Sequence, residues 1–128
     1  MRKFAGTLVL TLALFGAVAA APATETPFHF QLNKSAPEAD SRIESPEEVR
    51  LWFSQAPQDN SMQIRLIDAD GELVETGEVT RDAEDATVYS IAMNGSLPAA
   101  GYTVSWRAIG QDGHVVRGDF AFSVTAQN

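Results

Sequence analysis

The stretch from Gly101 to Val124 constrains the fold of this chain most, because it contains two strand-like patterns joined by a polar loop. Apolar side chains occupy every second position of the first pattern, at Tyr102, Val104, Trp106 and Ala108. The same alternation recurs in the second pattern, at Phe120, Phe122 and Val124. A period of two residues is typical of a β-strand with one buried face. The stretch therefore predicts a β-hairpin.

The loop of this hairpin, Gly110–His114, contains Asp112-Gly113, a pair typical of two-residue turns. Such a turn would put the apolar residues of the two strands on opposite faces, because directly opposed residues share a face. A loop of odd length centred on Asp112 instead pairs Tyr102 with Phe122, Val104 with Phe120 and Trp106 with Gly118. A β-bulge could also restore the match. We favour the odd-length loop, which gives Asp112 and His114 a role beyond turning the chain.

The N-terminal residues have the composition of a secretion signal. Arg2-Lys3 precedes an apolar run from Phe4 to Val18, and small residues suited to cleavage follow. The run is shorter than the roughly 20 residues of a membrane-spanning helix. We expect residues 1–20 to be a signal peptide, 21–27 a flexible leader and 28–126 one domain. The mature protein should then be exported and not embedded in a membrane.

Charge and cysteine content exclude several classes of function. Removal of Arg2 and Lys3 leaves 7 of the 9 basic residues against 17 acidic ones, a net charge of −10. Such a surface repels nucleic acid, so no nucleic-acid partner is expected. The acidity by itself indicates solubility and not a metal site. The absence of cysteine rules out disulfides and thiolate ligands.

The rest of the chain predicts five further short strands and no helix. They cover residues 28–33, 49–53, 62–66, 72–78 and 88–93, with turn residues between them. About seven strands at this spacing indicate an all-β, immunoglobulin-like Greek-key β-sandwich. Tyr102 suits a tyrosine corner, or simply a buried ring with its hydroxyl at the rim. We expect a core of Val49, Leu51, Phe53, Leu66, Val104, Trp106, Phe120 and Phe122.

Two segments together resemble the CopC family of periplasmic copper-resistance proteins. The first, His29-Phe-Gln-Leu-Asn-Lys-Ser-Ala-Pro37, is similar to the mature start of that family, His-x-x-Leu-x-x-Ser-x-Pro. The second, residues 101–122, is similar to its closing block, where Tyr-Thr-Val-x-Trp-Arg precedes Asp-Gly-His and Gly-x-Phe-x-Phe. The closing block is the more specific of the two.

The resemblance implies a periplasmic sandwich that binds Cu(II) at one end through His29, Asp112 and His114. This donor set is chemically reasonable, because imidazole nitrogen and carboxylate oxygen suit tetragonal Cu(II). His29 and His114 are the only histidines of the chain. A membrane copper transporter or another periplasmic copper protein is the partner that the resemblance implies.

Three features depart from the family pattern. The family's metal-binding histidine is the mature N-terminus, whereas cleavage after residue 19 or 20 would place His29 inside the chain. Gln55 stands where many members have Glu, so one carboxylate is missing. After signal removal only Met62 and Met93 remain, which disfavours a thioether site for Cu(I).

Two other functions are compatible with these residues. A non-enzymatic interaction domain that has lost or weakened its metal site would suit Gln55 and the internal position of His29. A copper monooxygenase would use an N-terminal histidine with a second histidine, but it needs a free amine on His29. The sequence contains no other catalytic constellation. We expect a copper carrier and no enzyme.

Overall fold

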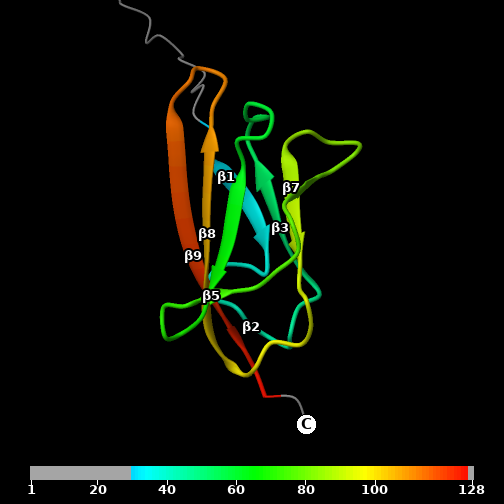
Figure 1. Cartoon of the computed structure of the whole chain (residues 1–128), viewed down its shortest axis with the longest axis vertical. Coiled ribbons are helices and arrows are strands. Elements are labelled where there is room, and N and C mark those ends of the chain that lie inside the picture. Colours follow the sequence, from blue (N-terminus) through cyan, green and yellow to red (C-terminus); the bar gives the residue numbers. More distant parts are fainter. Residues whose placement is uncertain (1–29, 127–128) are drawn as a thin grey trace, which may run out of the picture.

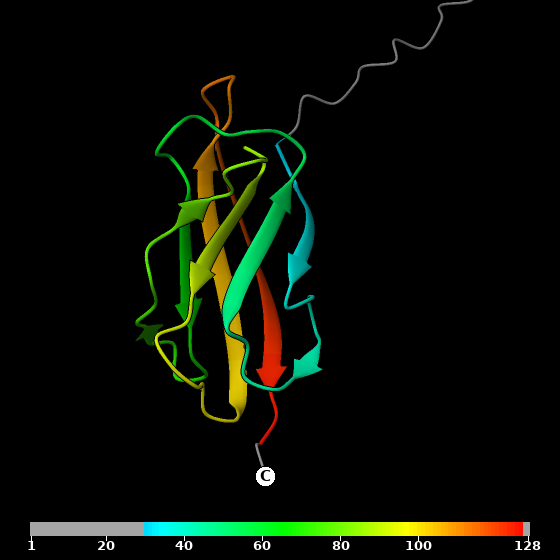
Figure 2. The same ribbon diagram turned by 90° about the vertical axis from the view of Figure 1, so that its right-hand side faces the viewer.

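Two β-sheets packed face to face form the part of the chain that the computed structural model describes, residues 30–126 (Figures 1 and 2). The expected signal peptide and leader, together with Phe28 and His29, lie outside the described residues. Within residues 30–126 the chain forms strands, turns and loops. No helix in this range is long and apolar enough to cross a membrane.

The strand order of both sheets is that of an immunoglobulin-like sandwich. The four-stranded sheet has the order β1 (Leu32–Ala36), β3 (Glu48–Phe53), β7 (Val88–Ala92), β6 (Thr80–Arg81). The five-stranded sheet has the order β2 (Arg42–Ile43), β9 (Val115–Val124), β8 (Ala100–Ile109), β4 (Gln63–Ile67), β5 (Leu73–Val74). With β2 and β5 set aside, these are the ABED and CFG sheets of that fold. The predicted fold class is confirmed.

The long hairpin of β8 and β9 has the register predicted for a loop centred on Asp112. Tyr102 lies opposite Phe122, Val104 opposite Phe120, and the ladder continues to Ile109 opposite Val115. Both apolar sets therefore face the four-stranded sheet. The hairpin carries its loop to one end of the sandwich, while the chain leaves β9 at the other end (Figure 1).

The core lies between the sheets and contains all but one of the predicted residues. Val49, Leu51, Leu66 and Val104 are fully buried, and Phe53, Trp106 and Phe122 are nearly so. The prediction was wrong for Phe120, which is half-buried at the margin of the core. At this level β9 has no second neighbour, because β2 pairs only with Ser123 and Val124. The sheet is therefore open beside Phe120.

Tyr102 forms the tyrosine corner that its position suggested. Its ring is buried and stacks on Phe122 at a centroid distance of 5.8 Å. Its hydroxyl donates a hydrogen bond of 2.7 Å to the carbonyl oxygen of Pro98, four residues earlier. Burial raises the pKa of the Tyr102 phenol. The bond fixes the turn that leads into β8.

Four local features differ from the sequence prediction. The strand predicted over residues 72–78 is present only as the two residues of β5. The first strand runs from Leu32 to Ala36, so Ser35 and Ala36 pair with β3 instead of forming a loop. β2 and β6, of two residues each, were not predicted. Each of these segments is strand-like because a neighbouring strand offers hydrogen bonds, and two residues are too few to show a period.

The indole of Trp106 packs closely over Gly118 in the hairpin. The two residues are paired across β8 and β9, and the indole covers the glycine. A Cβ atom at Gly118 would lie 2.5 Å from Cζ2 of Trp106. The ring cannot move away easily, because Phe53 and Phe30 pack edge-on against it. The distances between ring centroids are 5.0 Å to Phe53 and 6.0 Å to Phe30.

Gly118→Ala should therefore destabilise the fold by about 1–3 kcal/mol, the usual effect of overpacking a filled core. Gly101→Ala is the matched control, since Gly101 lies in the same hairpin and a Cβ there would meet nothing within 4 Å. Urea denaturation of both variants measures the difference. A lowered midpoint is expected for Gly118→Ala alone, and equal midpoints would contradict the packing described here.

Candidate metal centre

The loop Gly110–His114 closes the β8–β9 hairpin through two backbone hydrogen bonds. The amide of Gly110 donates to the carbonyl of His114, and the amide of Gly113 donates to the carbonyl of Gly110, both at 2.9 Å. Gly113 has a φ of 85°, a left-handed conformation that a glycine adopts without steric strain. The Asp-Gly-His sequence therefore builds one defined turn in which Asp112 and His114 flank the glycine.

The carboxylate of Asp112 contacts His114 through both oxygens. Oδ1 accepts a hydrogen bond from the backbone amide of His114 at 3.0 Å, and Oδ2 lies 2.9 Å from Nδ1 of its ring. The backbone bond first, and the side-chain bond second, lower the pKa of Asp112. Asp112 is therefore ionised at neutral pH and holds the imidazole in place.

This contact determines which ring nitrogen of His114 is available. A carboxylate can only accept a hydrogen bond, so neutral His114 places its proton on Nδ1 while the contact lasts. Nε2 then keeps a free lone pair. The His114 side chain is 83% exposed and that of Asp112 is 54% exposed. An ion in solvent can reach both residues without any rearrangement of the core.

A second loop supports the hairpin loop from the side, and no sequence pattern predicted this support. Nε2 of Gln58 donates to the carbonyl of Gly110, and Nε2 of Gln111 donates to the carbonyl of Ala56, each at 3.2 Å. The hydroxyl of Ser61 accepts a bond from the amide of Ile109 at 3.1 Å. These partners are about 50 residues apart in sequence, and no local pattern marks such pairs.

Phe30, the first described residue, packs beside the same loop. It is buried in the core, and its Cβ lies 3.8 Å from the point where a Cβ on Gly110 would stand. Figures 1 and 2 both show the start of the described chain at the end of the sandwich that carries the loop. The structure thus brings Asp112 and His114 together, while the predicted third ligand, His29, lies outside the described residues.

The hairpin loop receives no further ligand from Gln55, Met62 or Met93. Residues 30–126 contain no group of three His, Asp or Glu side chains placed to hold one ion. Gln55 is half-buried at the end of β3. Met62 is buried in the core and Met93 packs against it, so neither thioether faces the loop's solvent side.

The fold and the loop define an immunoglobulin-like sandwich with an exposed Asp-Gly-His turn at one end. A family model described as the CopC domain matches residues 32–125. The chain belongs to the CopC family. The match covers both sheets and the whole hairpin, so the resemblance seen in two sequence segments extends through the domain.

Individual relatives agree with this assignment. Copper resistance protein C of Escherichia coli is 29% identical over 110 aligned residues, which cover 75% of this chain and 81% of that protein. Copper transport protein CutJ of Bacillus subtilis is 26% identical over 97 residues, but the chain spans only 18% of its length. The crystal structure of PcoC, a methionine-rich copper resistance protein from Escherichia coli, has a TM-score of 0.68 and 30% identity. It covers 76% of this chain and 99% of PcoC.

The contact between Asp112 and His114 predicts a defined tautomer of His114 without any metal. In the wild-type chain at neutral pH, the Nδ1–H form should dominate, because the carboxylate accepts that proton. Asp112→Asn offers one neutral acceptor oxygen in place of two charged ones, so the Nε2–H form should gain population. Ring nitrogen chemical shifts in NMR measure this. Asp119→Asn on β9 is the control, and an unchanged tautomer ratio in Asp112→Asn would contradict the contact.

Proposed function

We propose that this protein is an exported, periplasmic copper carrier that binds Cu(II) through His29, Asp112 and His114. It sequesters the ion or passes it to a membrane copper transporter or another periplasmic copper protein. Its membership of the CopC family supports the proposal, as do relatives whose names refer to copper resistance and copper transport. The observation that carries it is the paired arrangement of Asp112 and His114.

The separation of these two side chains suits adjacent ligands of one ion. Nδ1 of His114 and Oδ2 of Asp112 are 2.9 Å apart. Metal–ligand bonds of about 2 Å at right angles, as in a tetragonal Cu(II) site, place neighbouring donors about 2.8 Å apart. An ion about 2 Å from both atoms would lie off the line that joins them, so the His114 ring would have to turn for both to ligate. Alternatively, His114 can ligate through Nε2 while Asp112 orients the ring, a common arrangement at metal sites.

His29 is the natural third donor because of its place in the chain. It is bonded to Phe30, and consecutive Cα atoms are about 3.8 Å apart. Phe30 is packed in the core beside the hairpin loop, and this supports taking the residue bonded to it as the third ligand. The loop itself rests on the sandwich, which limits the motion of the other two ligands.

The same residues favour binding over catalysis. Of the proposed ligands, the two that lie within residues 30–126, Asp112 and His114, are on an exposed turn. A metal-free interaction domain is the second candidate function, and one observation favours it: residues 30–126 supply only two grouped donors, with Gln55 in place of a carboxylate. Copper titration distinguishes the two. Residues 1–20 as a signal peptide and 21–27 as a leader belong to the same proposal.

Cu(II) should bind one site per chain, and His114→Ala should abolish tight binding while His29→Ala weakens it strongly. Asp119→Asn, an exposed carboxylate on the same hairpin, should bind as the wild type does. Affinity should fall at mildly acidic pH, because imidazole ligates only when neutral. Asp112 does not cause that fall, since its lowered pKa keeps it ionised at those pH values.

Competition titration with a Cu(II) chelator at several pH values measures these affinities. If His114→Ala titrates like the wild type, the site lies elsewhere. If the wild type shows no tight binding, the interaction-domain function is the better account.

The leader should weaken the site. If the mature chain begins at residue 20 or 21, His29 offers its imidazole but no terminal amine. A chain trimmed to begin at His29 gains a nitrogen donor that is already positioned, so it should bind Cu(II) more tightly. The same competition titration compares the two, with intact mass confirming each N-terminus. Equal affinities would show that the amine takes no part.

A further inference from the structure

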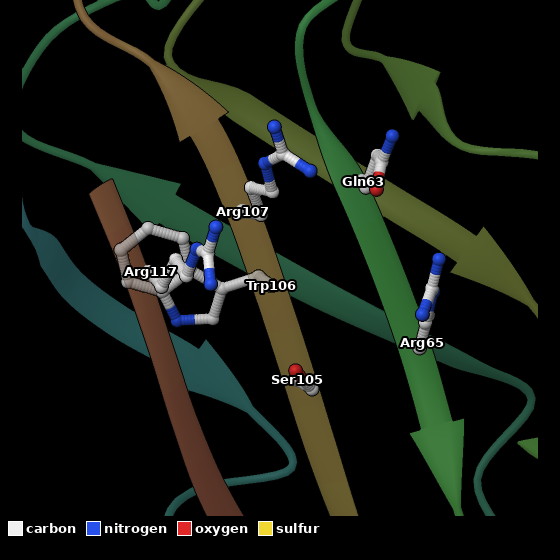
Figure 3. Close-up of a pocket in the computed structure, with 6 residues that line it drawn as sticks. All are labelled: Gln63, Arg65, Ser105, Trp106, Arg107 and Arg117. Atoms are coloured by element: carbon white, nitrogen blue, oxygen red, sulfur yellow. The ribbon is translucent and has the colours of Figure 1, made fainter. Parts of the chain in front are cut away.

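Three arginines lie together on the outer face of the five-stranded sheet. Arg65 is on β4, Arg107 on β8 and Arg117 on β9, and all three are exposed (Figure 3). Arg107 is paired directly opposite Arg117, and Arg65 is opposite Ser105. Together with Gln63 they line a shallow hollow on this face. We call Arg65, Arg107 and Arg117 the arginine face.

Three positive charges of the arginine face stand against one exposed carboxylate, that of Asp119, which lies two residues from Arg117 on the same side of β9. The three arginines form no ion pair among residues 30–126, whereas Arg50 pairs with Glu48 and Asp82, and Arg81 pairs with Asp59. Like charges directly opposite in an antiparallel pair are destabilising. The opposition of Arg107 and Arg117 is therefore unfavourable in the free protein. A bound anionic group would remove this repulsion.

The charge of the whole chain makes this cluster unusual. The sequence carries a net charge of −8, yet three of its nine basic residues share one small area. All three are arginine, whose planar guanidinium pairs with carboxylates through two parallel hydrogen bonds. Directly opposed like charges break a general rule of stable β-sheets, and proteins break such rules at functional sites. The arginine face is complementary to an acidic surface.

The shape of this area indicates the kind of anion. The hollow has a volume of about 210 Å³, below the roughly 300–1,000 Å³ of small-molecule sites. Figure 3 shows the three guanidinium groups standing apart on the sheet and not directed at one point. Strands are about 4.8 Å apart, and Arg65 and Arg117 are separated by two such spacings and by two residues along the strand direction. The area therefore suits several carboxylates in a row better than one small ion.

We propose that the arginine face docks an acidic segment of a partner protein, with carboxylates pairing to Arg65, Arg107 and Arg117. Docking would place the partner beside the hairpin loop, because Arg107 and Arg117 lie three residues from Gly110 and His114, about 10 Å along the strands. Binding at the arginine face needs no metal. It is therefore independent of the copper site.

A hexaglutamate peptide is the probe, titrated against the metal-free full mature chain by calorimetry at low ionic strength. The wild type should bind it saturably, and Arg107→Gln and Arg117→Gln should each weaken binding about threefold, as for exposed ion pairs. Arg42→Gln is the matched control. Arg42 is exposed on β2 opposite Ser123, about 20 Å along β9 from Arg117, and removes the same charge.

Two further measurements test whether the arginines bind the peptide through their charges. Affinity should fall as salt is added, because exposed charges are screened. The melting temperature of the free protein should rise in Arg117→Gln, since the repulsion is gone, and the peptide should raise it less there than in the wild type. All variants keep the core, so native tryptophan fluorescence confirms folding.

Three results would overturn the proposal. One is no peptide binding at low salt, and another is an equal loss of binding in Arg42→Gln. The third is inorganic phosphate binding as tightly as the peptide with the same dependence on Arg107 and Arg117, which would make the hollow a small-anion site. None of these results bears on copper binding, which His114→Ala tests separately.

Discussion

The pairing of β8 with β9 is the interaction on which the rest of the structure depends. Ten consecutive residue pairs join the two strands, from Ala100 with Val124 to Ile109 with Val115. This register alone sends both apolar sets inward and lets the Trp106 indole lie over Gly118. It also leaves residues 110–114 outside the ladder, as the loop that contains Asp112 and His114. A shift by a single residue would reverse the faces of the strand and change the length of this loop.

The hairpin loop combines a hydrogen-bonded base with two exposed candidate ligands. Its base is fixed by Gln58, Gln111 and Phe30, which come from segments distant in sequence. Asp112 and His114 at its tip remain open to solvent and hold each other through two hydrogen bonds. Donor atoms that are already positioned and still exposed to water suit the reversible binding of an ion, because binding requires no rearrangement of the core.

The two faces of the five-stranded sheet have different properties because residues alternate along each strand. The inner positions of β8 carry Tyr102, Val104 and Trp106 and form the core. The outer positions carry Ser105 and Arg107 and face solvent. The same alternation that builds the fold thus collects arginines from three strands on one surface. In an acidic protein this surface offers a partner a charge opposite to that of the remaining exterior.

The sequence by itself determined the fold class, the hairpin register and most of the core. These features follow from alternation over five or more residues, as in Tyr102–Ala108, and from turn residues such as Asp112-Gly113. The tyrosine corner at Tyr102 could be proposed for the same reason, since it depends on a residue only four positions away. Asp112 and His114 could be named as candidates because the turn and the family resemblance both point to them.

Tertiary structure alone decided the features that depend on distant neighbours. β2 and β6 are strands only because β9 and β7 lie beside them, and two residues carry no periodic signal. Phe120 is half-buried because β9 lacks a second neighbour at its level, which its own alternation cannot reveal. The support from Gln58 has the same origin, and so does the position of Arg65 on the strand beside Arg107. Each depends on a contact between segments far apart in the sequence, which no local pattern predicts.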